Sequence, residues 1–219
     1  MSGYLAETIS KLKEFEGCVP WMYRDTAGKV TVGVGLMLPD AATASALPFL
    51  LAETPADPEQ IAEEFARVNA LPQGKLPAFY KLPTSPQLPQ PAIDAKLSSV
   101  LTEFEATLRQ KLGGYDGLPD GVKMALLDMA YNLGPAGLLT GYPHMLNAIE
   151  TGSWSQAAAE CTREGISAAR NSWTRAQFLS TVVDSIRAEA RAEVRAEVKA
   201  IEKAPASWFG KLRKLLFGK

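Results

Sequence analysis

The chain has 219 residues, of which 47% are hydrophobic, and its formal net charge is −1. This length and composition are those of a globular protein with a sizeable core, whereas the near-neutral charge gives no support to nucleic-acid binding, so we expect no nucleic-acid partner. The single histidine, His144, excludes a multi-histidine metal site, and we expect neither a metal nor another cofactor.

The sequence carries two indications of the compartment. It has no apolar run near the ~20 residues that a membrane span needs, and its N-terminus lacks the basic, apolar and small-residue segments of a signal peptide. Cys18 and Cys161 do not make a disulfide framework, and we expect both to be free, buried thiols. We therefore expect a protein that is made in the cytoplasm without a signal peptide.

The first 38 residues predict a helix followed by a β-hairpin. Apolar residues recur at helical spacing at Leu5, Ile9, Leu12 and Phe15. Gly17 then favours a helix end, because glycine readily adopts the left-handed conformation found there. Further on, valines alternate with small residues over 30–35, which is typical of a strand.

Two carboxylates flank this helix end and the hairpin turn. Glu16 ends the apolar stripe, where loss of hydration would favour its protonated form and suit it to general acid catalysis. Asp25 opens Asp-Thr-Ala-Gly, the pattern of a type I turn, where it should be better hydrated and remain ionised. Two carboxyls with such different environments are what glycoside hydrolysis requires. Taken singly, each is more often an ordinary solvated surface group.

The combined pattern is more specific than either carboxylate. The order Glu16-Gly17, Tyr23, Asp25, Gly28, Thr31, Gly33 and Gly35 resembles the active-site signature of the phage-type lysozymes, glycoside hydrolase family 24. The resemblance implies a mainly α (α+β) protein: a two-lobed, lysozyme-like fold with a small N-terminal β-hairpin sheet. One departure is Leu36, at a position where phage members often carry a histidine.

The resemblance also implies catalytic roles. Glu16 would protonate the leaving glycosidic oxygen, and Asp25 with Thr31 would hold the attacking water on the opposite face of the sugar. The reaction would invert the anomeric carbon, as expected when a water lies between carboxylate and sugar. Tyr23 and Gly35 belong to the same signature and are expected to support the site or bind substrate.

We expect the catalytic domain to span residues 1–203, with a proline-rich insertion over 39–91 in the N-terminal lobe. Ten of the fifteen prolines lie in this insertion, which excludes continuous helix or central strand. Asp57-Pro58-Glu59-Gln60 nevertheless predicts a helix start. The insertion either packs on or near the cleft or is a surface linker without function.

Two further helices are predicted in the middle of the chain. Residues 93–112 carry an apolar face and resemble the long helix that joins the two lobes in the family. Asp120 is expected to cap a second, central helix that ends near Gly134. Asn132, close to that end, either faces the cleft and meets a substrate amide or satisfies nearby backbone groups.

The last helices are predicted from capping patterns. Residues 153–156 (Ser-Trp-Ser-Gln) and 174–177 (Thr-Arg-Ala-Gln) both match a capping box, which marks the start of a helix. In the family, an arginine near the start of the late helix pairs with the catalytic glutamate, and Arg175 occupies the matching place. The alternative is that Arg175 is a solvated arginine of the first turn.

The C-terminal part differs in composition from the rest. Residues 187–203 repeat Arg-Ala-Glu-Ala-like units and predict a charged, exposed helical extension, which either stands free or packs on the insertion. Residues 204–219 form a basic amphipathic tail, in which Trp208–Lys219 combines an apolar face with positive charge. Such a tail either contacts an anionic membrane or docks on the protein.

The sequence therefore predicts a peptidoglycan N-acetylmuramidase, an endolysin or antibacterial effector that hydrolyses the MurNAc-GlcNAc β-1,4 bond. Its partner would be bacterial peptidoglycan, it would act on the wall in the periplasm after release or delivery, and we expect a monomer. One alternative is a lytic transglycosylase, which needs the acid but no water-holding aspartate. Another is a non-catalytic wall-binding or membrane-active protein on a lysozyme fold.

Overall fold

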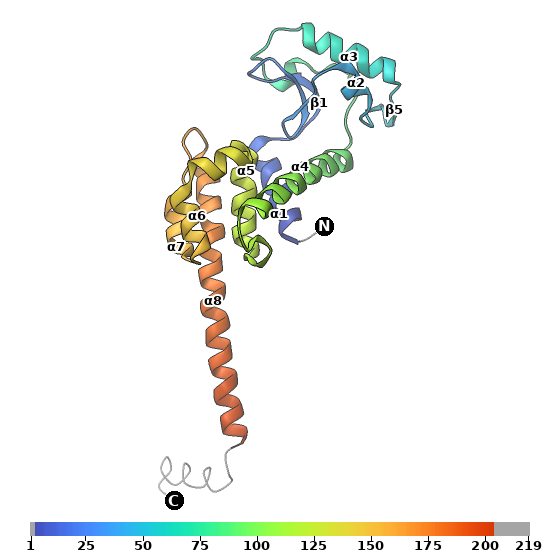
Figure 1. Cartoon of the computed structure of the whole chain (residues 1–219). Coiled ribbons are helices and arrows are strands. Elements are labelled where there is room, and N and C mark those ends of the chain that lie inside the picture. The colour runs from blue at the N-terminus through green and yellow to red at the C-terminus, as the bar shows by residue number, and fades with distance from the viewer. Residues whose placement is uncertain (1–2, 204–219) are drawn as a thin grey trace, which may run out of the picture.

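A computed structural model describes residues 3–203 of the chain, and its backbone forms two lobes (Figure 1). The N-terminal lobe contains the strands and the shorter helices: β1 (Val19–Arg24), β2 (Val30–Gly33), β3 (Leu36–Met37), α2 (Ala41–Ser45), β4 (Leu50–Leu51), β5 (Thr54–Pro55) and α3 (Pro58–Ala70). The helical lobe contains α1 (Gly3–Glu16), α5 (Asp120–Gly141), α6 (Pro143–Glu150), α7 (Trp154–Glu160) and the first part of α8 (Ala168–Glu202). The fold class expected from the sequence, mainly α with a small antiparallel sheet, is confirmed.

The N-terminal helix and hairpin form as the sequence predicts. Helix α1 buries Leu5, Ile9 and Leu12, and it ends at Glu16 because Gly17 adopts a φ of +78°. The sheet has the order β1-β2-β3 and is antiparallel throughout, with Tyr23 opposite Thr31. Every residue of β2 is buried, so this strand anchors the N-terminal lobe.

The proline-rich segment is part of the folded lobe and does not behave as a surface linker. Its apolar side chains are buried at Phe49, Ile61, Val68, Tyr80 and Leu88. Helix α3 begins where the sequence predicts, and the backbone N–H of its N-cap residue, Asp57, donates to the side chain of Gln60. The sequence predicts neither α2 nor the β4-β5 hairpin, because both are too short to have a periodic signal.

Helix α4 (Gln90–Lys111) runs between the two lobes, as the sequence predicts (Figure 1). Near its start, Ile93 packs against β2 so closely that a Cβ added to Gly33 would lie 3.2 Å from it. Helix α5 follows and is buried along most of its first half. Its backbone is non-helical at Gly134 (φ 72°, ψ 154°), where the sequence predicts the helix end, and a second helical segment continues from Pro135.

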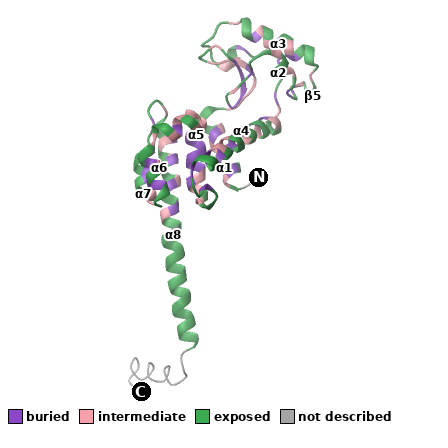
Figure 2. Ribbon diagram, in the orientation of Figure 1, coloured by how far each residue is buried: buried purple, intermediate pink, exposed green. Residues whose placement is uncertain are grey.

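Helix α8 has 35 residues, and only its first part packs on the body, against α5 and α7. From Val183 onward its described side chains are exposed, and the helix projects away from both lobes (Figures 1 and 2). The extension therefore does not pack on the 39–91 insertion, which lies at the other end of the molecule.

The basic tail, residues 204–219, lies outside the described residues. Within residues 3–203, no helix combines the length and apolarity needed to cross a membrane.

Candidate active site

A cleft of about 450 Å³ opens where the sheet, α4 and α5 meet. Its walls are largely apolar, and Glu16, Lys96 and Asn132 are the charged and amide side chains on them. The lining residues are Glu16, Gly33, Val34, Gly35, Leu36, Met37, Ile93, Lys96, Leu97, Val100, Phe104, Tyr131 and Asn132. A concave, mostly apolar cleft with a few polar groups on its walls is a typical ligand site.

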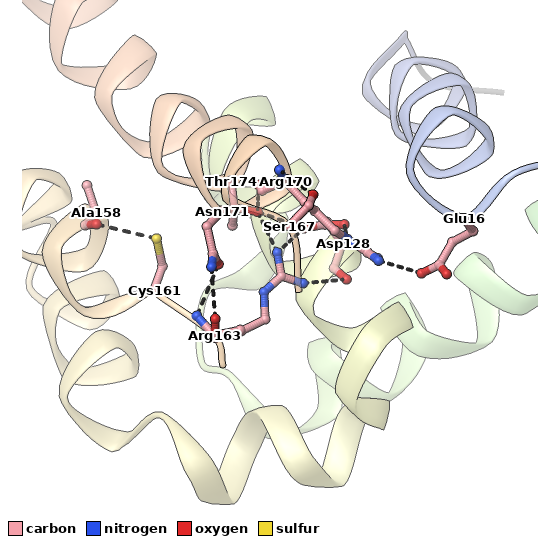
Figure 3. A network of polar contacts seen from close by, with 9 residues as sticks. All are labelled: Glu16, Asp128, Ala158, Cys161, Arg163, Ser167, Arg170, Asn171 and Thr174. Atoms are coloured by element: carbon pink, nitrogen blue, oxygen red, sulfur yellow. Dashed lines mark hydrogen bonds and ion pairs between the residues drawn. The ribbon is translucent and has the colours of Figure 1, made fainter. Parts of the chain in front are cut away.

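Glu16 is the carboxylate in this cleft, and an arginine holds it. The Nη1 group of Arg170 donates to Glu16 Oε1 at 2.5 Å, across 154 residues of sequence (Figure 3). The Arg170 guanidinium also lies over the ring of Phe15, 5.6 Å from its centroid. Because Phe15 and Glu16 are consecutive in α1, Arg170 fixes this end of the helix by both a charge-assisted hydrogen bond and a cation–π contact.

Arg170 is in turn held by a buried ionic network around Asp128 of α5. Asp128 Oδ1 accepts from Arg170 Nε at 2.8 Å, and Oδ2 accepts from Arg163 at 2.5 Å and from the Thr174 hydroxyl at 2.7 Å (Figure 3). These four residues are at most 4% exposed.

The network balances its charges only when Glu16 is included. Two guanidinium groups face the single carboxylate of Asp128, so the Glu16 carboxylate supplies the second negative charge. Burial alone lowers the pKa of Arg170, but the Asp128 and Glu16 carboxylates outweigh this effect and raise it. Arg170 therefore remains a cation and holds Glu16 at the cleft.

The prediction that Arg175 pairs with Glu16 is wrong. Helix α8 begins seven residues before the predicted start, with Ser167 as its N-cap and the Ser167 hydroxyl accepting from the backbone N–H of Arg170. Arg175 is exposed and donates to the Thr162 hydroxyl at 3.3 Å, as the solvated alternative expects. The arginine that pairs with Glu16 is therefore Arg170, about one and a half turns earlier.

Asp25 and Thr31 come together across the hairpin turn. Asp25 Oδ1 accepts from the Lys29 backbone N–H at 2.7 Å, and the buried Thr31 hydroxyl lies 3.4 Å from Oδ2. Neither residue lines the cleft that contains Glu16, among the described residues. The expectation that Glu16 is the less hydrated carboxyl is also wrong, because Asp25 is half-buried whereas Glu16 is exposed, with 34% of its side chain accessible. The cause is that Glu16 projects from a helix end into the cleft.

Two partly buried tyrosines feel the charge of the carboxylates. Burial raises the pKa of Tyr23, and the negative charges of Asp25 and then Glu16 raise it further. Burial raises the pKa of Tyr131 to about 12, again with a contribution from Glu16. The Tyr131 hydroxyl donates to the Val34 carbonyl, which ties α5 to the loop after β2. Both phenols are therefore protonated near neutral pH.

The remaining predicted residues lie at the cleft. Asn132 is exposed and lines it, which favours the alternative in which it meets substrate. Gly35 adopts a φ of +68°, and its Cα faces the Tyr131 hydroxyl, so a side chain there would be strained and would narrow the cleft.

The proline-rich segment braces the turn that carries Asp25. Arg24 donates from Nε to the Gly28 carbonyl at 3.0 Å and from Nη1 to the Leu71 carbonyl at 2.6 Å. Gln73 lies against Gly28. The insertion therefore acts on the site through the hairpin, although none of the described lining residues of the cleft belongs to it.

The other chemistry-bearing groups do not form a second centre. No group of three or more His, Cys, Asp or Glu side chains within residues 3–203 could hold a metal ion. Both cysteines are free; Cys161 is buried, which raises its pKa, whereas Cys18 is half-buried rather than buried as expected.

A scan against protein-family models and a search of curated proteins found no match for this chain.

Proposed function

We propose that this protein is a peptidoglycan N-acetylmuramidase that hydrolyses the β-1,4 bond between MurNAc and GlcNAc. The observation that carries the proposal is the placement of Glu16 at the cleft by Arg170, with Asp25 and Thr31 paired on the adjacent hairpin. Glycosidases use two carboxylates on different elements, and here one lies in the cleft and the other on the hairpin whose strands β2 and β3 line it.

The reaction follows from these positions. Glu16 acts in its protonated form: Arg170 binds Oε1, and Oε2 carries the proton that the leaving glycosidic oxygen takes. The carboxylate that results then supplies the negative charge that balances Arg170. Asp25 accepts a proton from the attacking water, and the Thr31 hydroxyl beside it orients that water. Attack from the face opposite the leaving group inverts the anomeric carbon.

The lytic transglycosylase alternative uses the same acid but closes the sugar on its own hydroxyl, without a water. It therefore assigns no chemical role to Asp25. The non-catalytic alternative assigns no chemical role to either carboxylate. The two alternatives differ from the muramidase in what they predict for variants of Asp25 and Glu16.

Delivery belongs to the same proposal. The enzyme would reach the wall from the cytoplasm after release or injection, and the basic tail over Trp208–Lys219 would contact anionic lipid during that passage. The anionic surface would attract its Lys and Arg side chains, and its Trp, Phe and Leu side chains would insert.

The Asp25→Asn variant tests the water-activating role. It keeps an oxygen for the Lys29 backbone N–H and removes the base, so we expect lysis of purified peptidoglycan in a turbidity assay to fall by ~10² or more. Asp116→Asn, at an exposed aspartate paired with Arg109, is the control and should keep full activity. Full activity of Asp25→Asn would contradict hydrolysis by water held at Asp25 and would favour the transglycosylase.

A further inference from the structure

The extension of α8 presents an apolar stripe to solvent. Six large apolar side chains of this helix are 40–59% exposed: Leu179, Val183, Ile186, Val194, Val198 and Ile201. With Ala190 they follow one another every three or four residues, and Leu179, Ala190 and Ile201 are spaced at intervals of eleven. Eleven residues are close to three helical turns, so the stripe runs almost straight along one face, for roughly 30 Å.

Charged residues border this stripe with one sign on each side. Arg187, Arg191 and Arg195 lie four residues apart on one flank, and Glu189, Glu193 and Glu197 lie on the other. Like charges at this spacing repel weakly along the helix. Of these charges, Arg187 alone makes an ion pair within the described part of the chain, with Asp184 at 3.7 Å.

We propose that the second copy of this chain covers the stripe, and that two α8 helices pair in parallel. In a parallel pair, the two-fold axis runs along the helices, so the arginine flank of each faces the glutamate flank of the other. An antiparallel pair would instead place arginines beside arginines and glutamates beside glutamates. The charge pattern thus selects both the partner and the orientation. The proposed dimer differs from the monomer expected from the sequence.

Other occupants fit this face less well. An anionic membrane would attract the arginine flank, but it would repel the glutamate flank that borders the same stripe. The 39–91 segment lies in the other lobe, away from the extension (Figure 1). From Val183 onward the stripe lies on the part of α8 that projects from the body, so a second helix can lie along it without displacing the packing on α5 and α7 (Figure 2).

Parallel pairing would place two bodies at the same end of the paired helices. Each would present its cleft to a polymer of repeating units, and binding at one cleft would raise the local concentration of substrate at the other. The pairing itself does not depend on the proposed muramidase activity.

Analytical ultracentrifugation of the full chain tests the pairing. We expect a dimer at tens of micromolar for the wild type. The triple variant Glu189→Arg/Glu193→Arg/Glu197→Arg makes both flanks basic, and Arg187→Glu/Arg191→Glu/Arg195→Glu makes both acidic, so each alone should be monomeric. An equimolar mixture of the two should form a dimer again, which shows that the loss came from charge and not from unfolding.

A cysteine at the far end of the stripe tests the orientation. Parallel pairing brings the two copies of residue 201 together, so Ile201→Cys should form a disulfide-linked dimer on a non-reducing gel. The same substitution in the triple-arginine variant is the matched control, and it should not form a disulfide-linked dimer. Any one of three results would overturn the proposal. These are a wild type that is monomeric at 100 µM, dimers that persist in both triple variants, and failure of Ile201→Cys to cross-link in a dimeric protein.

Discussion

Glu16→Gln is expected to lower the rate of peptidoglycan lysis by ~10² or more, because it removes the proton donor and keeps the shape of the side chain. The amide oxygen of glutamine can still accept from Arg170, so the end of α1 should retain its position. The measurement is the initial rate of turbidity loss with purified peptidoglycan, at matched concentrations of folded protein.

Glu14→Gln is the matched control for this variant. Glu14 lies on the same helix, is exposed, and pairs with Lys11 at 2.7 Å, so its loss should change neither lysis nor folding noticeably. Lysis by Glu16→Gln at the wild-type rate would show that Glu16 is not the acid, and it would remove the basis of the proposed function.

Asp128→Asn is expected to have the largest effect on stability. It leaves the guanidinium groups of Arg163 and Arg170 buried with Glu16 as the nearest countercharge, and breaking a buried ionic network in this way costs roughly 3–5 kcal/mol. Unfolding in urea should show this loss, and the midpoint of thermal unfolding should fall by roughly 10 °C.

The control is Asp184→Asn, which removes an exposed partner of Arg187 and should change stability by no more than about 0.5 kcal/mol. If Asp128→Asn cost less than about 1 kcal/mol, the network would not be what holds Arg170. Lysis by Asp128→Asn should also fall at temperatures where the variant is folded, because Arg170 would no longer be fixed beside Glu16.

The parts of the fold that the sequence predicts correctly are those with strong local signals. The stripe of α1, the glycine that ends it and the turn at Asp25 are all encoded by residues near one another in the chain, so periodicity and turn chemistry suffice. The same holds for the start of α3, where aspartate, proline and glutamine occupy their preferred positions.

The start of α8 shows where such signals fail. Thr174 and Gln177 match a capping box, but the pattern lies inside a helix that Ser167 has already begun. The Thr174 hydroxyl donates to Asp128 and does not cap the start of a helix. A four-residue motif cannot show whether its threonine caps a helix or bonds to a distant side chain. The pairing of Arg170 with Glu16 likewise joins residues that are far apart in the chain, so local patterns do not reveal it.

Asp128 carries a signal in the sequence, although it belongs to no recognised motif. It stands alone in the apolar run Ala125–Ala130, where a carboxylate must be buried and must therefore find cationic partners. Its partners, Arg163 and Arg170, could not be identified among the many arginines without the fold. The hydration of Glu16 was mispredicted for a similar reason, since the neighbours in sequence are apolar but the side chain faces the cleft.

The chemistry of the released sugar ends tests the central claim most directly. Purified peptidoglycan is digested with the wild type and with Glu16→Gln, and the soluble fragments are analysed by mass spectrometry. Hydrolysis predicts fragments that end in reducing MurNAc, formed by the wild type and nearly absent with Glu16→Gln. Fragments that end in anhydro-MurNAc, or the absence of any glycan cleavage by the wild type, would contradict the account.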